Sequence, residues 1–246
     1  MVKRSNTLLA KVLRVRLSAL GRFALASFLV LTHAGMLTAS AQTAVGGQVD
    51  HFTDTSMLKP PPGDKIALIE WEDLECPACA HAFPFVHQAL NHYHIPYVRY
   101  DFLIPNHIWS HQAAVDARYM QDKISPDFAE DYRRQVFANQ YRIASQDDLL
   151  NFTKQYMSSH GKQMPFVVDP TGQFEREVQA DVNLGKKLGL IYTPTIVVAT
   201  QHKWIEVKDV SDLYAAIDQA MASLGQQSAA APSPAHHSAA HHTAVH

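Results

Sequence analysis

Two hydrophobic periods along the chain predict strands and helices. The run Ile66–Ile69, followed by Trp71, is apolar and β-prone over the length of a strand, which predicts a strand that is buried on both faces of a sheet. Polar and apolar residues alternate over 95–104 and predict a second strand. A strand at 196–198 and its return at 203–207 complete the predicted sheet.

Helical periodicity fills the rest of this region. Apolar residues recur every three to four positions over 77–93, and three further helical patterns lie between 111 and 160. Another helix is predicted at 173–188, with Gly189 as its C-cap, and a last one at 211–224. This order of elements predicts an α/β fold with a mixed sheet and an all-helical insertion.

The first 41 residues have the pattern of an export signal. Six basic residues and no acidic residue accompany an apolar run at Phe23–Leu31, and Ala39-Ser40-Ala41 predicts cleavage before Gln42. An uncleaved membrane anchor is the alternative, although Thr32 interrupts the run before it reaches spanning length. Both readings predict export, to the periplasm or beyond.

Three further segments are expected. Residues 42–63 form a linker with a short edge strand at 49–52, and residues 64–225 form one α/β domain whose helical insertion spans about 106–170. Residues 226–246 consist mainly of Ala, Ser, Pro and His, a composition that cannot bury enough apolar area to order itself. Its five histidines are interpreted as part of a solvated tail with weak affinity for transition metals.

Charge excludes one class of partner. The chain has 246 residues, 47% of them hydrophobic, and a formal net charge of −2. Loss of the six basic residues of the export signal would lower that charge to about −8. An acidic exported protein repels the phosphate backbone of nucleic acid, so no nucleic-acid partner is expected.

Both cysteines of the chain lie in the segment Cys76-Pro77-Ala78-Cys79. Pro77 suits the first helical turn, which leaves Cys76 at the N-cap, where free N–H groups and the helix dipole stabilise a thiolate. Cys79, one turn further in, is interpreted as the resolving thiol. Disulfides persist outside the cytosol, but a loop this short adds little stability. Redox reactivity is therefore the better explanation for the pair.

Three motifs together resemble a known family. They are the buried strand followed by Cys76-Pro77-Ala78-Cys79, the segment Asp101–Pro105 leading to His111-Gln-Ala-Ala, and the segment from Leu188 to Thr195 that contains Thr-Pro. Over residues 64–224 the chain resembles exported DsbA-like thiol-disulfide oxidoreductases. The resemblance implies a thioredoxin-like fold with an inserted helical domain.

The resemblance also implies roles for individual residues. Cys76 and Cys79 are the catalytic pair, and Pro77 and Ala78 complete the active-site loop. Pro194 is expected to follow a cis bond and to face the cysteines, and Thr193 is expected to offer backbone groups to substrate. The implied partners are cysteine-containing exported proteins and a membrane redox partner that recycles the pair; no cofactor and no metal are expected.

One departure from the family concerns the pKa of Cys76. Many strongly oxidising relatives carry histidine at the position of Ala78. Four acidic residues also precede the pair: Glu70, Glu72, Asp73 and Glu75. If they crowd Cys76, like charge raises its pKa above the roughly 3.5 of the most oxidising enzymes, towards the roughly 7 of thioredoxin. The alternative is that these acids are solvated at the end of a strand.

Two alternative functions stay open. The same pair could run the reaction in reverse, as a reductase or isomerase. The chain could instead bind a metal through Cys76, Cys79 and His81, with the histidine-rich tail supplying it, although three residues within one turn rarely complete a site with four ligands.

Overall fold

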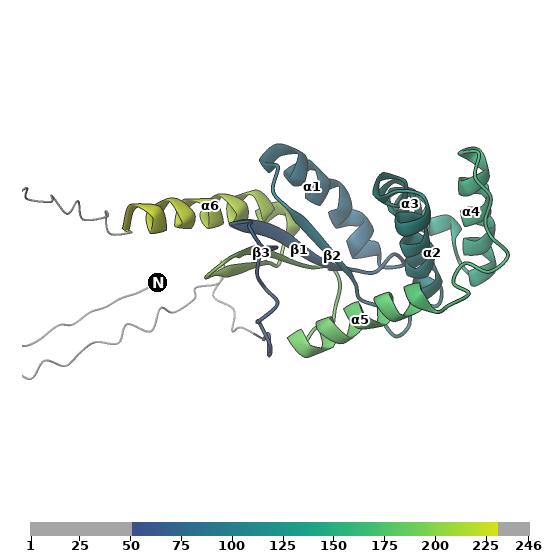
Figure 1. Ribbon diagram of the computed structural model, residues 1–246, viewed down its shortest axis with the longest axis horizontal. Helices are drawn as coiled ribbons and strands as arrows, with labels where there is room; N and C mark the ends of the chain where they lie inside the picture. Colours follow the sequence, from purple (N-terminus) through teal and green to yellow (C-terminus); the bar gives the residue numbers. More distant parts are fainter. Residues whose placement is uncertain (1–50, 231–246) are drawn as a thin grey trace, which may run out of the picture. The chain divides into compact units, whose positions relative to one another are not determined.

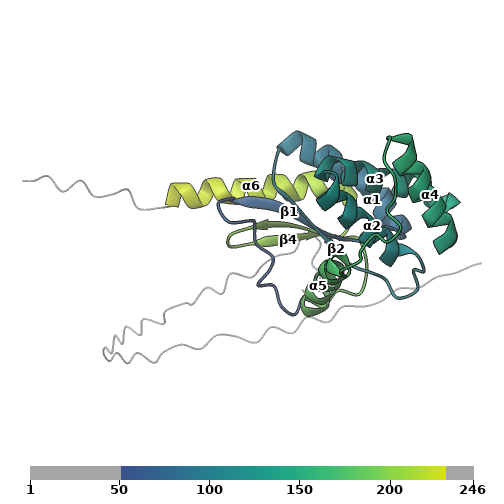
Figure 2. The same cartoon turned by 45° about the vertical axis from the view of Figure 1, so that its right-hand side comes forward.

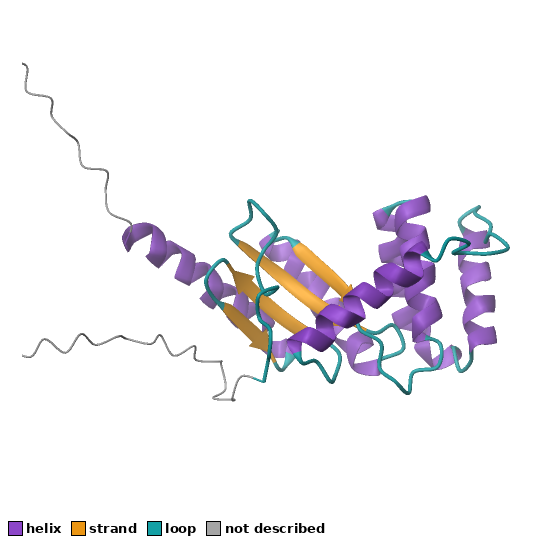
Figure 3. Cartoon of the chain, turned by 60° about the horizontal axis from the view of Figure 1, so that its bottom comes forward, coloured by secondary structure: helices purple, strands orange, loops and turns teal. Residues whose placement is uncertain are grey.

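The computed structural model describes residues 51–230, so the predicted export signal and most of the predicted tail lie outside the described residues. One mixed sheet is formed by β1 (Ile66–Glu72), β2 (Tyr97–Asp101), β3 (Thr195–Thr200) and β4 (Trp204–Val207). The strand order is β2-β1-β3-β4; β1 is parallel to β2 and antiparallel to β3, and β4 is antiparallel to β3 (Figure 3). The predicted fold class is confirmed.

Six α-helices surround this sheet: α1 (Pro77–Tyr93), α2 (Ser110–Lys123), α3 (Pro126–Asn139), α4 (Gln146–Ser159), α5 (Gln173–Leu188) and α6 (Leu213–Ala230). Helices α1 and α6 lie on one face of the sheet and α5 lies on the other, while α2, α3 and α4 gather beyond one end of the strands (Figures 1 and 2). None of the helices in residues 51–230 has the length and apolar character required to cross a membrane.

Strand β1 is the centre of the core because it is buried along its whole length. Alternate side chains of a strand point to opposite faces. Leu68 therefore packs with Val86 of α1 and Ile217 of α6, whereas Ile69 packs with Leu188 of α5 on the other face. This confirms the prediction of a strand that is covered on both sides.

The cysteine pair belongs to the core of the helical insertion. Cys76 and Cys79 lie in the same apolar cluster as Met120 of α2, Tyr132 of α3 and Leu149 of α4. The insertion therefore covers the N-terminal end of α1, and it can influence the chemistry there.

Two boundary predictions are wrong. The predicted edge strand at 49–52 lies partly outside the described residues, and the part that is described, His51 and Phe52, is not a strand. Phe52 packs against Trp204 with ring centroids 5.1 Å apart, and the N–H of Thr53 donates to Leu188 O at 2.9 Å. This segment docks against the end of α5 and against Trp204 of β4. Helix α6 continues to Ala230, because the residues after the predicted helix end are also compatible with helix.

Candidate active site

Cys76 and Cys79 lie at the beginning of α1, as predicted. Cys76 is the N-cap, with φ −78° and ψ 119°, and Pro77 occupies the first turn, where a missing N–H costs nothing. Both cysteines are free thiols. Cys76 is 7% exposed and Cys79 only 1%, while Pro77 and Ala78 are exposed between them. Attack from outside the protein is therefore directed at Cys76.

The two thiols have opposite pKa shifts. The Cys79 thiol donates a hydrogen bond to the Cys76 sulfur, and this is the largest cause of a Cys76 pKa lowered to about 6. Burial opposes the change, while Thr193 and the N–H groups of Cys79 and Ala78 reinforce it. Burial raises the pKa of Cys79 well above its ordinary value, and the neighbouring Cys76 adds to this effect. At neutral pH, Cys76 is thus the thiolate and Cys79 the thiol.

The loop that precedes β3 faces this thiolate. The Thr193–Pro194 peptide bond is cis, as the resemblance implied. The sulfur of Cys76 lies 3.4 Å from the carbonyl oxygen of Thr193, which is 117 residues away in the sequence. Thr193 is buried and Pro194 is partly exposed, so the loop forms one wall beside the sulfur.

The four acidic residues before Cys76 do not crowd its sulfur. Three of them are almost fully buried, with exposures of 2% for Glu70, 1% for Glu72 and 1% for Asp73, and Glu75 is partly buried. None of them is among the main causes of the Cys76 pKa shift. Both sequence-based interpretations, crowding and solvation at a strand end, are therefore wrong. The physical reason is that Glu72, Asp73 and Glu75 each find a partner in the helical insertion, whereas Glu70 is paired with Tyr97 of β2.

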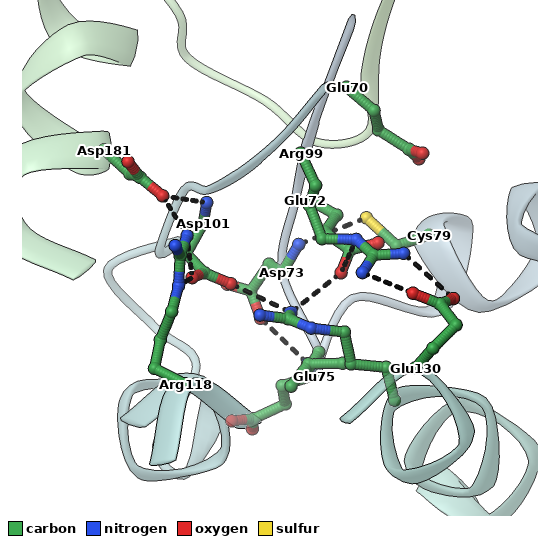
Figure 4. Close-up of polar contacts among 12 residues, drawn as sticks. Glu70, Glu72, Asp73, Glu75, Cys79, Arg99, Asp101, Arg118, Glu130 and Asp181 are labelled. Atoms are coloured by element: carbon green, nitrogen blue, oxygen red, sulfur yellow. Dashed lines mark hydrogen bonds and ion pairs between the residues drawn. The ribbon is translucent and has the colours of Figure 1, made fainter. Parts of the chain in front are cut away.

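Asp73 shows how such an acid is used. Its carboxylate accepts hydrogen bonds from the N–H groups of Glu75 and Ile104, each at 2.8 Å, and lies 2.8 Å from His107 Nδ1. Its own N–H lies 3.5 Å from the Cys79 sulfur (Figure 4). Asp73 therefore holds the loop that joins β1 to α1, with its carboxylate engaged by Glu75, Ile104 and His107.

Glu72 belongs to a buried ion-pair network (Figure 4). Its carboxylate lies 3.0 Å from Arg99 Nε and 2.9 Å from Arg133 Nη1. Arg133 also donates to Asp101 at 3.0 Å, and Arg118 Nε donates to Asp101 at 2.8 Å. Because Arg118 lies on α2 and Arg133 on α3, the network ties the helical insertion to β1 and β2.

Glu70 is the member of the four that lies next to the cysteine chemistry. It shares the face of β1 that α1 covers, and the Tyr97 hydroxyl donates to it at 2.6 Å. Burial raises the pKa of Glu70 to about 8, with Glu72 adding to the effect, against the opposing contributions of Tyr97 and Arg99. The charge of Glu70 in turn helps to raise the pKa of Cys79. Glu70 is therefore protonated at neutral pH and is electrostatically coupled to the buried thiol of Cys79, an interaction that the sequence analysis missed.

Replacing Glu70 with glutamine should stabilise the protein increasingly as the pH rises from about 5 to 8. The folded wild-type protein keeps a proton on Glu70 up to about pH 8, whereas the unfolded chain releases it at the ordinary pKa of 4.5. The stability that wild-type Glu70 contributes is therefore fully present below pH 4.5 and is lost as the pH rises to about 8. Glutamine keeps the acceptor for Tyr97 and does not titrate. Melting temperatures measured from pH 5 to 9 check this, with Glu175→Gln as an exposed control. A gain in melting temperature that is independent of pH would contradict the raised pKa of Glu70.

The metal-binding alternative finds no site in the described part of the chain. No group of three or more His, Cys, Asp or Glu side chains within residues 51–230 is placed to hold a metal ion. His81, the third ligand considered from the sequence, is exposed and contacts Phe85, with ring centroids 5.3 Å apart. The histidine-rich tail lies outside the described residues.

Comparison with known proteins places this site in a family. Residues 63–219, more than half of the chain, match the family model described as thioredoxin. Similar solved structures include the thiol-disulfide exchange protein α-DsbA2 from Wolbachia pipientis, with 15% identity and a TM-score of 0.53 over 65% of this chain and 84% of that chain. Oxidised BdbD from Bacillus subtilis has 18% identity and a TM-score of 0.54, covering 72% and 98% of the two chains.

A periplasmic thioredoxin-like protein from Salmonella enterica serovar Typhimurium is also similar, with 17% identity and a TM-score of 0.50 over 66% of this chain and 88% of that chain. No curated protein sequence gives a significant match. At these identities the structural matches establish the fold, and the family model establishes the family. The chain therefore belongs to the thioredoxin family and has the fold of DsbA-type thiol-disulfide oxidoreductases.

Proposed function

We propose that this protein is an exported thiol-disulfide oxidoreductase that oxidises the dithiols of other exported proteins through Cys76 and Cys79. One observation carries the proposal. The Cys76 thiolate at the N-terminus of α1 faces the Thr193–Pro194 loop, and the buried thiol of Cys79, whose pKa is raised, lies one turn further along the helix. This asymmetry supports Cys76 as the attacked sulfur and Cys79 as the resolving sulfur.

The first step begins with Cys76 and Cys79 joined in a disulfide. A substrate thiolate attacks the Cys76 sulfur, and the bond to Cys79 breaks, so that Cys79 leaves with the electron pair. Because the pKa of Cys79 is raised, this new thiolate takes up a proton, and Glu70 is protonated beside it at neutral pH. The product is a mixed disulfide between substrate and Cys76.

The second step releases the product. A second substrate thiolate attacks the substrate sulfur of the mixed disulfide, and Cys76 leaves as a thiolate. Its low pKa makes it a good leaving group, since release is faster from the more acidic thiol. Two electrons pass from the substrate dithiol to the protein pair, and the substrate gains a disulfide. The backbone of Thr193, beside the reacting sulfur, holds the extended substrate segment during both steps.

Two features support an exported oxidant that is recycled by a partner. The N-terminal segment combines basic residues, an apolar run and a small-residue cleavage site, and a similar structure is described as periplasmic. Each cycle leaves the pair reduced, so an external acceptor must remove two electrons. We assign that task to a membrane redox partner.

The pKa of Cys76 gives specific support to the reverse direction as the second candidate. A value of about 6 is higher than the roughly 3.5 of the strongest oxidants and close to the roughly 7 of thioredoxin. A thiolate that is less stabilised makes the disulfide a milder oxidant. A reductase or isomerase that uses the same two sulfurs is therefore the alternative.

The reduction potential of the pair, measured by equilibration in glutathione buffers, tests the direction. We expect a value between the roughly −120 mV of strong oxidants and the roughly −270 mV of thioredoxin, together with stoichiometric oxidation of a dithiol peptide. A potential below about −270 mV without peptide oxidation would establish the reductase instead. Peptide oxidation that persists in a Cys76→Ser variant would refute the site itself.

A further inference from the structure

The loop Asp73–Cys76, which joins β1 to α1, is held by the helical insertion on more than one side. Besides the contacts of Asp73, the carboxylate of Glu75 accepts hydrogen bonds from the N–H groups of Trp109 at 2.7 Å and Ser110 at 3.0 Å, at the beginning of α2. In the contacts of Glu75 the loop supplies the carboxylate and the insertion supplies the N–H donors. The carbonyl groups of the loop require donors of their own.

Gln140 provides a donor to two of these carbonyl groups. It begins the short 3-10 helix Gln140–Arg142 that follows α3, and its side-chain Nε2 donates to Leu74 O at 2.8 Å and to Cys76 O at 3.0 Å. One amide group thus bridges two carbonyl groups on either side of Glu75. Leu74 is only 2% exposed, so its carbonyl would lose its partner in a poorly solvated place if the amide were removed.

This bridge acts on the residue that carries the thiolate. Cys76 O also accepts the first hydrogen bond of α1, from Ala80 N at 3.1 Å, so the amide of Gln140 and the first turn of the helix meet at one carbonyl. The direction of that peptide group sets where the Cys76 sulfur lies relative to the N–H groups of Ala78 and Cys79, which stabilise its charge. A loop that relaxes would move the sulfur out of line with those donors.

We propose that Gln140 is a positioning residue for the thiol chemistry: its amide clamps the Leu74 and Cys76 carbonyls and thereby holds the Cys76 sulfur against the N-terminus of α1. This inference rests on the proposed function, which it deepens by assigning a reactivity-setting contact to the helical insertion. Gln140 donates to backbone carbonyl groups and to no sulfur, so it acts on the reaction through the position of the loop and of Cys76. The inserted domain then tunes the thiolate as well as covering it.

The test is a Gln140→Met variant of the mature full chain. Methionine keeps the length of the side chain, carries no charge and has no donor. Thiolate absorbance followed against pH should show a higher Cys76 pKa; because one pKa unit is a tenfold change in the equilibrium constant, a rise by about one unit lowers the thiolate fraction at pH 6 about five-fold. Alkylation by iodoacetamide at pH 6 should slow by the same factor, whereas the rate at pH 9 should change little.

Two further variants keep the test decisive. Gln140→Asn retains the amide but shortens its reach, and it should also raise the pKa of Cys76. Gln155→Met, at an exposed glutamine of α4, should leave it unchanged. A lower melting temperature in both Gln140 variants with an unchanged Cys76 pKa would show a purely structural role and overturn the proposal. Failure of the wild-type protein to exchange disulfides would instead refute the proposed function, since the pKa measurement does not depend on turnover.

Discussion

A Cys79→Ser variant is expected to accumulate a stable mixed disulfide with a disulfide-bonded peptide, while the wild-type protein forms this adduct only transiently. Cys76 is the thiolate at neutral pH and attacks the peptide disulfide, and the other peptide sulfur leaves as a thiolate. Without Cys79 the protein has no second sulfur to attack Cys76 and release the peptide. Serine is the appropriate replacement because its hydroxyl can still donate to the Cys76 sulfur, which is the largest cause of the low pKa. Intact-protein mass spectrometry at pH 7 measures the adduct.

The matched control is Cys76→Ser. Its remaining thiol, Cys79, is only 1% exposed and has a raised pKa, so less than about one in a hundred molecules carries the thiolate at pH 7. We therefore expect adduct formation to be at least about a hundred times slower than in the Cys79→Ser variant. Comparable rates in the two variants would show that the assignment of attacking and resolving sulfurs is incorrect.

Replacing Arg133 with methionine should lower the free energy of unfolding by about 3 kcal/mol. Arg133 is 1% exposed and pairs with two carboxylates that are also almost fully buried, those of Glu72 and Asp101. Loss of one partner from a buried pair leaves an uncompensated charge. We expect a loss of unfolding free energy at the lower end of the roughly 3–5 kcal/mol that breaking a buried ion pair costs. The reason is that Arg99 still contacts Glu72 and Arg118 still contacts Asp101 in the variant.

The next residue of α3 provides the control. Arg134 is 53% exposed and pairs with Asp131, so Arg134→Met should cost less than about 0.5 kcal/mol. Urea unfolding at pH 7 compares the two variants, and equal losses would contradict the importance of the buried network.

The pH dependence of the Arg133→Met variant has a definite sign. Burial opposes ionisation of Asp101, but Arg133 and Arg118 hold its pKa below the ordinary value. A lowered carboxyl pKa contributes stability at neutral pH that is lost as the pH falls through the folded-state value. The difference in stability between wild type and Arg133→Met should therefore narrow as the pH falls below about 4.

Elements with strong local signals were predicted well. Strand β1 followed from its apolar run, and the start of α1 followed from Pro77 after Cys76. Helix α5 has its predicted bounds, because Gly189 ends it in the left-handed conformation with φ 91°. The segment at His51 and Phe52, predicted as an edge strand, carries no comparable local signal. Its position is decided by the apolar surface that the folded domain offers to it.

Part of the acidic cluster was also predictable in principle. Glu70 alternates with Ile69 and Trp71 in a strand buried on both faces, which places its carboxyl group beneath the cysteine helix. Its partners were not predictable. Arg133, which pairs with Glu72, lies 61 residues away in the sequence, and the Gln140 amide that bridges Leu74 and Cys76 lies 66 residues from Leu74. Spacing alone does not show which distant side chain meets a buried charge.

The sequence by itself determined the reactive pair, its place at the start of a helix and the class of fold. These follow from local features: the period of the hydrophobic residues, the proline in the first helical turn and the spacing of three between the cysteines. The helix start also predicted that Cys76 is the thiolate. Only the tertiary structure decided how far the two thiol pKa values lie apart, that Glu70 holds a proton, and that Gln140 holds the loop. Each of these depends on how far a group is removed from water and on which charges and donors surround it. Those quantities arise only when distant parts of the chain pack together.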